Sequence, residues 1–236
     1  MRSTGKLATL NPYGSEMQID IFSDVVCPWC FIGKRHLESA LALYGAQHPD
    51  AVLPKVVWHP FQLNPQLPVE GMPRGDYTSA KFGGAERARE IYARVAQAGT
   101  KAGIEFRFDD IRVQPNTVDA HQLILLAGAF DAQDGVAESL FTGYFLEGCD
   151  LSQRQTLLDL AERGGLPRAE SENCLETQQL RPQVEEQDQQ ARSLGVEGVP
   201  FFVFNQKLAA SGAQPPEVLA DAMGQAASMP EIETEA

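Results

Sequence analysis

Positive charge is scarce in this 236-residue chain. Lysine and arginine number 19 against 32 aspartates and glutamates, which gives a formal net charge of −13 at pH 7. Nucleic acids and anionic membrane surfaces are also negatively charged, so they repel a protein with this net charge. We therefore expect neither a nucleic acid nor a membrane among the binding partners.

Long apolar runs are also missing, and no stretch of about 18 apolar residues is present to form a transmembrane helix. Residues 1–16 contain Arg2 and Lys6 but lack the apolar segment and the small-residue cleavage site of a secretory signal. We expect a cytoplasmic protein in which residues 1–16 are an unstructured extension and residues 228–236 an acidic tail.

Cysteine is also scarce. Four cysteines are too few for a disulfide framework in a chain of this length. Zinc commonly takes two close pairs of ligands, whereas Cys149 and Cys174 each stand alone. We interpret both as buried structural thiols, with a second redox pair as the open alternative. No Gly-rich phosphate loop precedes a suitable helix, so we expect no bound metal and no bound cofactor.

One close cysteine pair is present, in the motif Cys-Pro-Trp-Cys at residues 27–30. The β-branched and aromatic run at residues 19–22 predicts a strand before it, and apolar residues at helical spacing predict a helix after it. Cys27 then falls at the helix N-cap, and Pro28 at the first helical position, where its missing N–H costs nothing.

This position predicts thiol chemistry. Free N–H groups and the positive end of the helix dipole stabilise a thiolate, so we expect the pKa of Cys27 to lie below that of a free cysteine. Cys30 is close enough to form a disulfide with Cys27 and to expel a partner that Cys27 has captured. The pair therefore indicates a redox-active disulfide; the alternatives are a zinc half-site and two packing cysteines.

The remaining elements have the order strand, helices, hairpin, helix. Residues 56–58 predict a strand parallel to the first, and residues 201–211 predict a hairpin that turns at Asn205-Gln206. Pro215-Pro216 starts a final helix. The helices expected between these strands lie within residues 88–98, 116–127, 136–145, 157–161 and 180–194. Asn116 and Asp119 are expected to cap the second of these.

Four stretches of the chain are similar to a known family. They are SDVVCPWCFIG at 23–33, PFQLNP at 60–65, PNT with Ala120-His121 at 115–121, and GVPFF at 198–202. Together they resemble the DsbA-like thioredoxin-fold family, and in particular its FrnE-like branch of dithiol–disulfide oxidoreductases.

The resemblance implies an α/β thioredoxin fold with a central mixed sheet and a large all-helical insertion. The thioredoxin-like domain would comprise residues 17–72 and 182–227, and the insertion residues 73–181. It further implies that the Val199–Pro200 bond is cis and faces the two cysteines. The neighbouring backbone would then pair with an extended substrate, as in strand addition.

The middle residues of the motif, Pro28 and Trp29, bring no positive charge, so we expect a moderately reducing couple. Trp29 should be partly exposed, either as an apolar contact for substrate or packed against the insertion. Asp24 either carries protons for Cys30 or satisfies local backbone N–H groups.

Four further polar residues are accessory candidates at most. We interpret His59 and His121 as hydrogen-bonded core histidines rather than ligands. The alternative is that either one lines a cleft beside the insertion. Asn116 and Thr117 either contact a ligand or cap a helix.

Three functions remain open. The first is a cytosolic thiol–disulfide oxidoreductase that acts on a protein or small molecule containing a disulfide or thiol. The second is a glutathione-dependent isomerase or transferase, similar to 2-hydroxychromene-2-carboxylate isomerase and the kappa-class transferases, with glutathione as co-substrate. The third is a thiol-based chaperone module. The oligomeric state, monomer or homodimer, stays open as well.

Overall fold

The computed structural model describes residues 17–230, so the predictions for residues 1–16 and for most of the acidic tail lie outside the described residues. A four-stranded mixed sheet forms the centre, in the order β2-β1-β5-β6. Its strands are β1 (Gln18–Ser23), β2 (Lys55–Pro60), β5 (Phe201–Phe204) and β6 (Leu208–Ser211).

β1 pairs with a neighbour on each side. It is parallel to β2, with Ile21 opposite Trp58, and antiparallel to β5, with Ile21 opposite Phe202.

Asn205, Gln206 and Lys207 join β5 to β6, because Phe204 pairs with Leu208. Asn205 and Gln206 both have positive φ, and the Lys207 N–H donates to the Phe204 carbonyl at 3.0 Å to close the turn. The predicted strands, their directions and this turn are confirmed.

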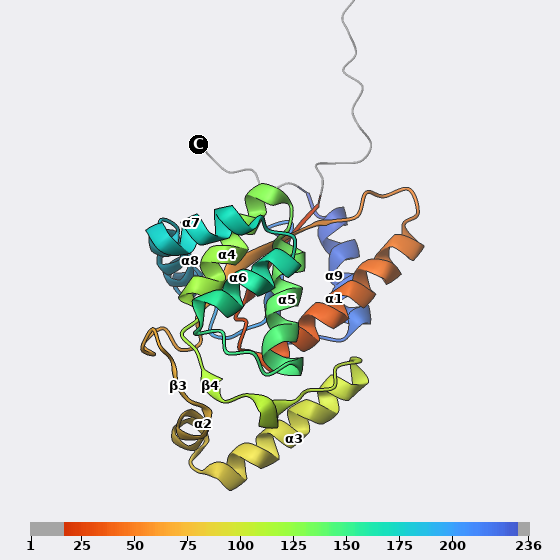
Figure 1. Ribbon diagram of the computed structural model, residues 1–236. Helices are drawn as coiled ribbons and strands as arrows, with labels where there is room; N and C mark the ends of the chain where they lie inside the picture. The colour runs from red at the N-terminus through yellow and green to blue at the C-terminus, as the bar shows by residue number, and fades with distance from the viewer. Residues whose placement is uncertain (1–16, 231–236) are drawn as a thin grey trace, which may run out of the picture.

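Helices cover both sides of the sheet (Figure 1). α1 (Pro28–Gln47) and α9 (Pro216–Ser228) pack side by side, whereas helices from the second half of the insertion and the helix that follows it contact β2. The insertion helices and the helix that follows them are α2 (Arg74–Phe82), α3 (Ala85–Lys101), α4 (Val118–Ala127), α5 (Gln133–Leu146), α6 (Arg154–Arg163), α7 (Arg168–Thr177) and α8 (Arg181–Ser193). The fold is the expected thioredoxin-like sheet with a helical insertion.

The first part of the insertion forms a layer of its own below the other helices in Figure 1. Here β3 (Met72–Pro73) pairs antiparallel with β4 (Val113–Gln114) beside α2 and α3, and a short 3-10 turn, Phe108–Asp110, precedes β4. A second 3-10 turn, Gly128–Phe130, follows α4 elsewhere in the insertion. α3 also contacts α1, so this layer lies next to the helix that carries the cysteine pair.

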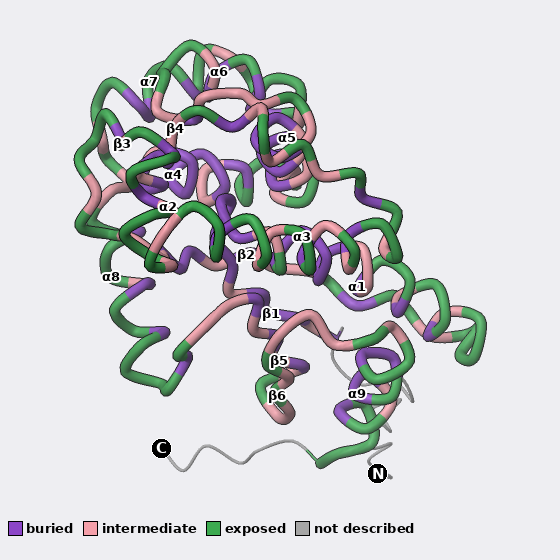
Figure 2. The backbone as a smooth tube through the Cα atoms, turned by 90° about the horizontal axis from the view of Figure 1, so that it is seen from below, coloured by how far each residue is buried: buried purple, intermediate pink, exposed green. Residues whose placement is uncertain are grey.

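One continuous apolar core joins the sheet to the insertion, and Figure 2 shows buried positions following β1, α4 and α5. Phe31 of α1 stacks on Phe141 of α5, with ring centroids 5.2 Å apart, and Phe106 meets it edge-on. Trp58 of β2 lies 6.2 Å from Phe141. Aromatic side chains bury large areas, so this cluster fixes the start of α1 against α5.

The outer edge of β2 is closed by a side chain. The Gln133 amide accepts a hydrogen bond from the Trp58 N–H and donates one to the Trp58 carbonyl, both at 3.2 Å. It therefore satisfies two backbone groups that a further strand would otherwise satisfy.

Several local predictions were wrong. α7 was not expected, because its ten residues carry no clear apolar stripe. Thr117, rather than Asn116, is the N-cap of α4, and Asp119 accepts hydrogen bonds from the side chains of Gln122 and Gln178 instead of closing a capping box. The helix predicted within residues 180–194 ends at Ser193, and Leu194 beyond it is 80% exposed.

In residues 17–230 no helix is both long and apolar enough to cross a membrane.

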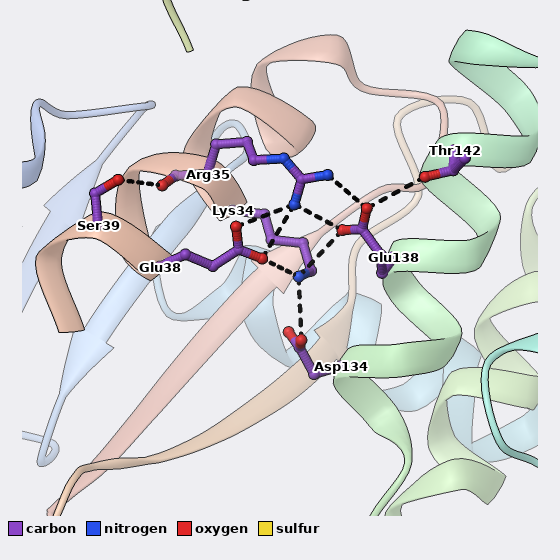
Figure 3. Close-up of polar contacts among 7 residues, drawn as sticks. All are labelled: Lys34, Arg35, Glu38, Ser39, Asp134, Glu138 and Thr142. Atoms are coloured by element: carbon purple, nitrogen blue, oxygen red, sulfur yellow. Dashed lines mark hydrogen bonds and ion pairs between the residues drawn. The ribbon is translucent and has the colours of Figure 1, made fainter. Parts of the chain in front are cut away.

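A charged network ties α1 to α5 immediately after the cysteine motif (Figure 3). Lys34 is only 3% exposed and contacts Glu38, Asp134 at 3.0 Å and Glu138 at 3.2 Å. Arg35 meets Glu138 at 2.5 Å. Burial opposes the charge on Glu138, but Arg35 and Lys34 outweigh it and lower the pKa of this carboxyl group.

We expect Glu138→Gln to reduce the free energy of unfolding by about 1 kcal/mol at pH 7, because Glu138 is one-third exposed and solvent weakens the pairing. The lowered pKa means that this stabilisation is complete above the ordinary glutamate pKa of about 4.3 and is lost as the pH falls through the folded-state value. Urea unfolding at pH 7 and pH 3.5 measures both effects.

The matched control is Glu185→Gln, which removes an exposed pair with Arg181 on α8. This change should cost less than about 0.5 kcal/mol at either pH. A destabilisation by Glu138→Gln that grows on acidification would contradict the assignment.

Candidate active site

The cysteine motif lies where β1 turns into α1. The Cys27 N–H donates to the Asp24 carbonyl at 2.9 Å, which closes the turn after the strand. Cys27 is the N-cap with φ −94° and ψ 111°, and Pro28 is the first residue of α1. The N–H of Cys30 donates back to the Cys27 carbonyl at 3.0 Å. Both cysteines are therefore on the first turn of one helix, as the sequence predicts, and both are free thiols.

Cys27 faces the loop that enters β5. The Val199–Pro200 bond is cis, and the Cys27 thiol donates to the Val199 carbonyl at an Sγ–O distance of 3.5 Å. Cys27 is 5% exposed, whereas Trp29 beside it is 43% exposed. The structure thus brings together Cys27 and the two residues of the cis-proline loop, with Trp29 at the surface.

Cys30 is 1% exposed. Burial raises the pKa of its thiol well above the ordinary value, and the neighbouring Cys27 raises it further. The Ser23 hydroxyl and the Asp24 backbone offset this pKa shift in part. Cys30 is consequently a thiol at neutral pH, and a base has to remove its proton before it can attack.

The segment after β2 lies at the same end of the sheet. The Phe61 N–H donates to the Ser23 carbonyl at 3.0 Å, and the Leu63 N–H donates to Asp24 Oδ2 at 2.7 Å. Asp188 of α8 accepts from the Gln62 N–H at 2.7 Å. Asp24 is completely buried, and its Oδ2 anchors the loop that follows β2.

The two histidines have different surroundings. His59 Nε2 lies 2.7 Å from Asp20 Oδ1, and its ring stacks on Phe22 with centroids 5.0 Å apart. His121 of α4 is 2% exposed, and its Nε2 lies 3.4 Å from Asp24 Oδ1 without hydrogen-bond geometry. His121 is therefore a buried histidine, the simpler of the two interpretations offered for it, and it lies close to Asp24, which nothing in the sequence indicates.

Asn116 and Thr117 support the start of α4. Asn116 Oδ1 accepts from the Val118 N–H at 3.0 Å, and its Nδ2 donates to the Leu67 carbonyl at 2.7 Å. Thr117 is buried and makes no capping hydrogen bond through its side chain. The contacts of Asn116 give it a structural role at the start of α4, and the Thr117 carbonyl accepts a hydrogen bond from the His121 N–H at 3.0 Å.

The other two cysteines are separate free thiols. Cys174 on α7 is fully buried, and burial raises its pKa to about 11. Cys149, between α5 and α6, is half-buried; burial and the nearby Glu147 raise its pKa. Within residues 17–230, no cluster of three or more histidine, cysteine or carboxylate side chains is arranged to hold a metal ion.

Comparisons with known proteins agree with this geometry. A family model described as the DSBA-like thioredoxin domain matches residues 18–224. The structure is similar to that of a probable DsbA oxidoreductase from Streptomyces coelicolor, with 28% identity, a TM-score of 0.82, and coverage of 93% of this chain and 94% of that one.

Two other relatives are more distant. The uncharacterized protein YwbO of Bacillus subtilis (strain 168) is 26% identical over 161 residues, which are 68% of this chain and 72% of that protein. The cytosolic disulfide reductase DsbM of Pseudomonas aeruginosa, solved with GSH, has 18% identity and a TM-score of 0.59, with coverage of 89% of this chain and 96% of that one. At 18% identity this likeness concerns the fold.

The close approach of α1 to the cis-proline loop depends on Gly33. A Cβ atom at this position would lie 2.8 Å from Pro200 Cγ and 3.2 Å from Phe202 Cζ. We expect Gly33→Ala to displace Pro200 and to lower the free energy of unfolding by about 1–3 kcal/mol, as overpacking does. Urea unfolding measures this change.

Gly224→Ala in α9 is the matched control, because nothing lies within 4 Å of its added Cβ atom. It should leave stability unchanged or raise it by up to about 1 kcal/mol, since alanine is the better helix former. Equal effects of the two substitutions would show that α1 does not need a glycine against Pro200.

Proposed function

Because the chain belongs to the DSBA-like thioredoxin domain family, we propose that it is a dithiol–disulfide oxidoreductase in which Cys27 attacks and Cys30 resolves. One observation carries this proposal. Two free thiols stand three residues apart on the first turn of α1; Cys27 lies against a cis-proline loop, and Cys30 is buried.

The reaction consists of two exchanges at sulfur. The Cys27 thiolate attacks a substrate disulfide, one substrate sulfur leaves as a thiolate, and a mixed disulfide forms on Cys27. Cys30 then loses its proton and attacks Cys27 Sγ, so that the Cys27–Cys30 bond forms and the second substrate thiolate leaves. Two electrons pass from the protein to the substrate, and a reductant of the dithiol class restores the pair.

Substrate binding is assigned to the backbone of Val199 and Pro200 and to the apolar surface of Pro28 and Trp29. The Val199 carbonyl already accepts from Cys27, so an extended segment beside this loop would bring its disulfide within reach of the thiol. The exposed Trp29 offers an apolar contact at the same place. A protein or a small molecule with a disulfide or thiol fits this arrangement.

Within the family we assign the chain to the FrnE-like branch, on the stretches SDVVCPWCFIG and GVPFF. A cytoplasmic location and glutathione as a co-substrate belong to the same proposal. The uncharged Pro28-Trp29 dipeptide supports a moderately reducing couple, since no cation between the cysteines stabilises the thiolate.

We expect Cys27 and Cys30 to titrate as one two-electron couple in a glutathione redox buffer, between the potentials of thioredoxin and the glutaredoxins, about −270 to −200 mV. Cys27→Ser should abolish reduction of a model disulfide, and Cys30→Ser should trap a mixed disulfide on Cys27. Mass spectrometry of alkylated samples measures all three.

Cys174→Ser is the control, because this cysteine is fully buried and should leave the couple unchanged. A stable glutathione adduct on Cys27, with no Cys27–Cys30 disulfide at any potential, would instead favour a glutathione-dependent transferase or isomerase. Binding of unfolded chains without turnover would favour a thiol-based chaperone.

A further inference from the structure

A cavity lies in the first part of the insertion, between α2, α3 and the segment that leads into β4, in the layer below the other helices in Figure 1. Its volume is about 550 Å³, which is within the range of small-molecule sites in proteins. The charged residues that line it in the described part of the chain are three arginines and one aspartate: Arg74, Arg89, Arg112 and Asp109. The cavity is therefore positive in a chain whose formal net charge is −13.

Arg74, at the start of α2, is only 9% exposed. Its guanidinium group donates to Tyr92 Oη at 2.6 Å, to Tyr144 Oη at 3.4 Å, and to Gln114 Oε1. Burial raises the pKa of both phenols, although Arg74 opposes this shift, so both are neutral at pH 7. Among residues 17–230 no carboxylate forms an ion pair with Arg74, and its positive charge is uncompensated.

A buried charge without an opposite charge is costly, because hydrogen bonds to neutral groups replace only part of its hydration. The ring of Tyr77 lies 5.6 Å from Arg74 Cζ and adds a cation–π contact, which stabilises the guanidinium but does not neutralise it. Arg89 and Arg112 are exposed, and neither forms an ion pair in the part of the chain that the structure describes. Three guanidinium groups on one cavity are thus available to an anion.

Aromatic rings form another part of the lining. The ring centroids of Tyr92 and Phe108 are 4.7 Å apart, and Phe106 stacks on Phe108 at 4.8 Å. All three side chains are half-buried, so each keeps some exposed surface. Small side chains of α3 leave room beside the rings: Ala85, Ala88, Ala93 and Ala96. A flat aromatic group fits such a surface, since aromatic rings pack in offset or edge-to-face contacts.

We propose that this cavity binds a small organic acid in which a carboxylate or phosphate group is attached to a flat aromatic ring system. The three arginines bind the acid group, because guanidinium groups pair with carboxylate and phosphate oxygens through two parallel hydrogen bonds. The aromatic rings bind the flat group. Asp109 accepts a hydrogen bond from a hydroxyl or amino substituent and repels a second acid group.

The cavity adjoins the helix that carries the cysteines but is separate from the exchange site. Phe106 lines the cavity and meets Phe31, the residue after Cys30, with ring centroids 6.1 Å apart. Neither cysteine of the motif and no residue of the cis-proline loop belongs to the lining. Binding of the acid therefore needs no thiol, and the site does not depend on the proposed function.

A structural role of Arg74 is the competing explanation, because its hydrogen bonds join α2 to β4 and α5. The decisive variant is therefore Arg89→Gln/Arg112→Gln, which removes two exposed charges of the cavity and leaves Arg74 in place. The matched control is Arg87→Gln/Arg94→Gln. It makes the same change in net charge at two exposed positions of α3 that do not line the cavity.

The experiment is isothermal titration calorimetry at pH 7 in a phosphate-free buffer, with 1-naphthoate, 1-naphthyl phosphate and the neutral 1-naphthamide as probes. We expect at least one of the two acids to bind one-to-one and about tenfold or more tightly than the amide. The decisive variant should weaken binding of that acid about tenfold or more, whereas the control and Cys27→Ser should change it less than about twofold. The acid that binds more tightly identifies carboxylate or phosphate as the preferred group.

Equal binding of the acids and the amide would overturn the proposal, and so would an equal loss of affinity in the decisive variant and its control. Inorganic phosphate that binds as tightly as 1-naphthyl phosphate would overturn the aromatic part of the assignment. Loss of binding in Cys27→Ser would place the probe at the exchange site instead. Arg74→Gln should abolish the preference for the acid; if this variant does not fold by circular dichroism, Arg89→Gln/Arg112→Gln decides alone.

Discussion

The pairing of β1 with both of its neighbours is the constraint on which the site depends. Because β1 is antiparallel to β5, the residues that follow β1 meet the residues that precede β5 at one end of the sheet. Cys27 belongs to the first group and Pro200 to the second, although they are far apart in sequence. The parallel partner β2 ends at the same end of the sheet, so the loop that follows β2 reaches Asp24. Three chain segments thus converge on the first turn of α1.

The two thiols of that turn differ because of what surrounds them. Both thiols are buried, but Cys27 contacts the Val199 carbonyl of the cis-proline loop, whereas Cys30 is only 1% exposed and has a raised pKa. The two cysteines lie on the same helical turn, so the difference in their surroundings comes from tertiary packing. The charged network of Lys34 and Arg35 holds α1 in place one turn further on, and the aromatic contact of Phe31 does so from the core side. The helix that carries the two cysteines is therefore also the helix that the ion pairs and the aromatic cluster hold against α5.

Local patterns in the sequence predict much of this architecture. Apolar periodicity finds β1 and α1, the Cys27-Pro28 step marks the helix start, and Asn205-Gln206 marks the hairpin. What fails is whatever depends on distant partners. α7 buries only Ser171, Cys174 and Leu175, which are too few apolar positions to form a recognisable stripe in the sequence. His121 and Asp24 are 97 positions apart, and only the placement of α4 beside the β1–α1 turn brings them together.

The hydrogen bonds between Gln133 and Trp58 also bear on how the protein behaves among copies of itself. An exposed sheet edge offers unpaired N–H and C=O groups to any passing strand and invites aggregation. Near the centre of β2, the Gln133 amide hydrogen-bonds to both backbone groups of Trp58, so these groups are not available to a strand of another molecule. Gln133 belongs to a helix and cannot itself extend the sheet. In the described part of the chain, the other edge strand is β6, which is only four residues long and so offers another molecule few backbone groups to pair with.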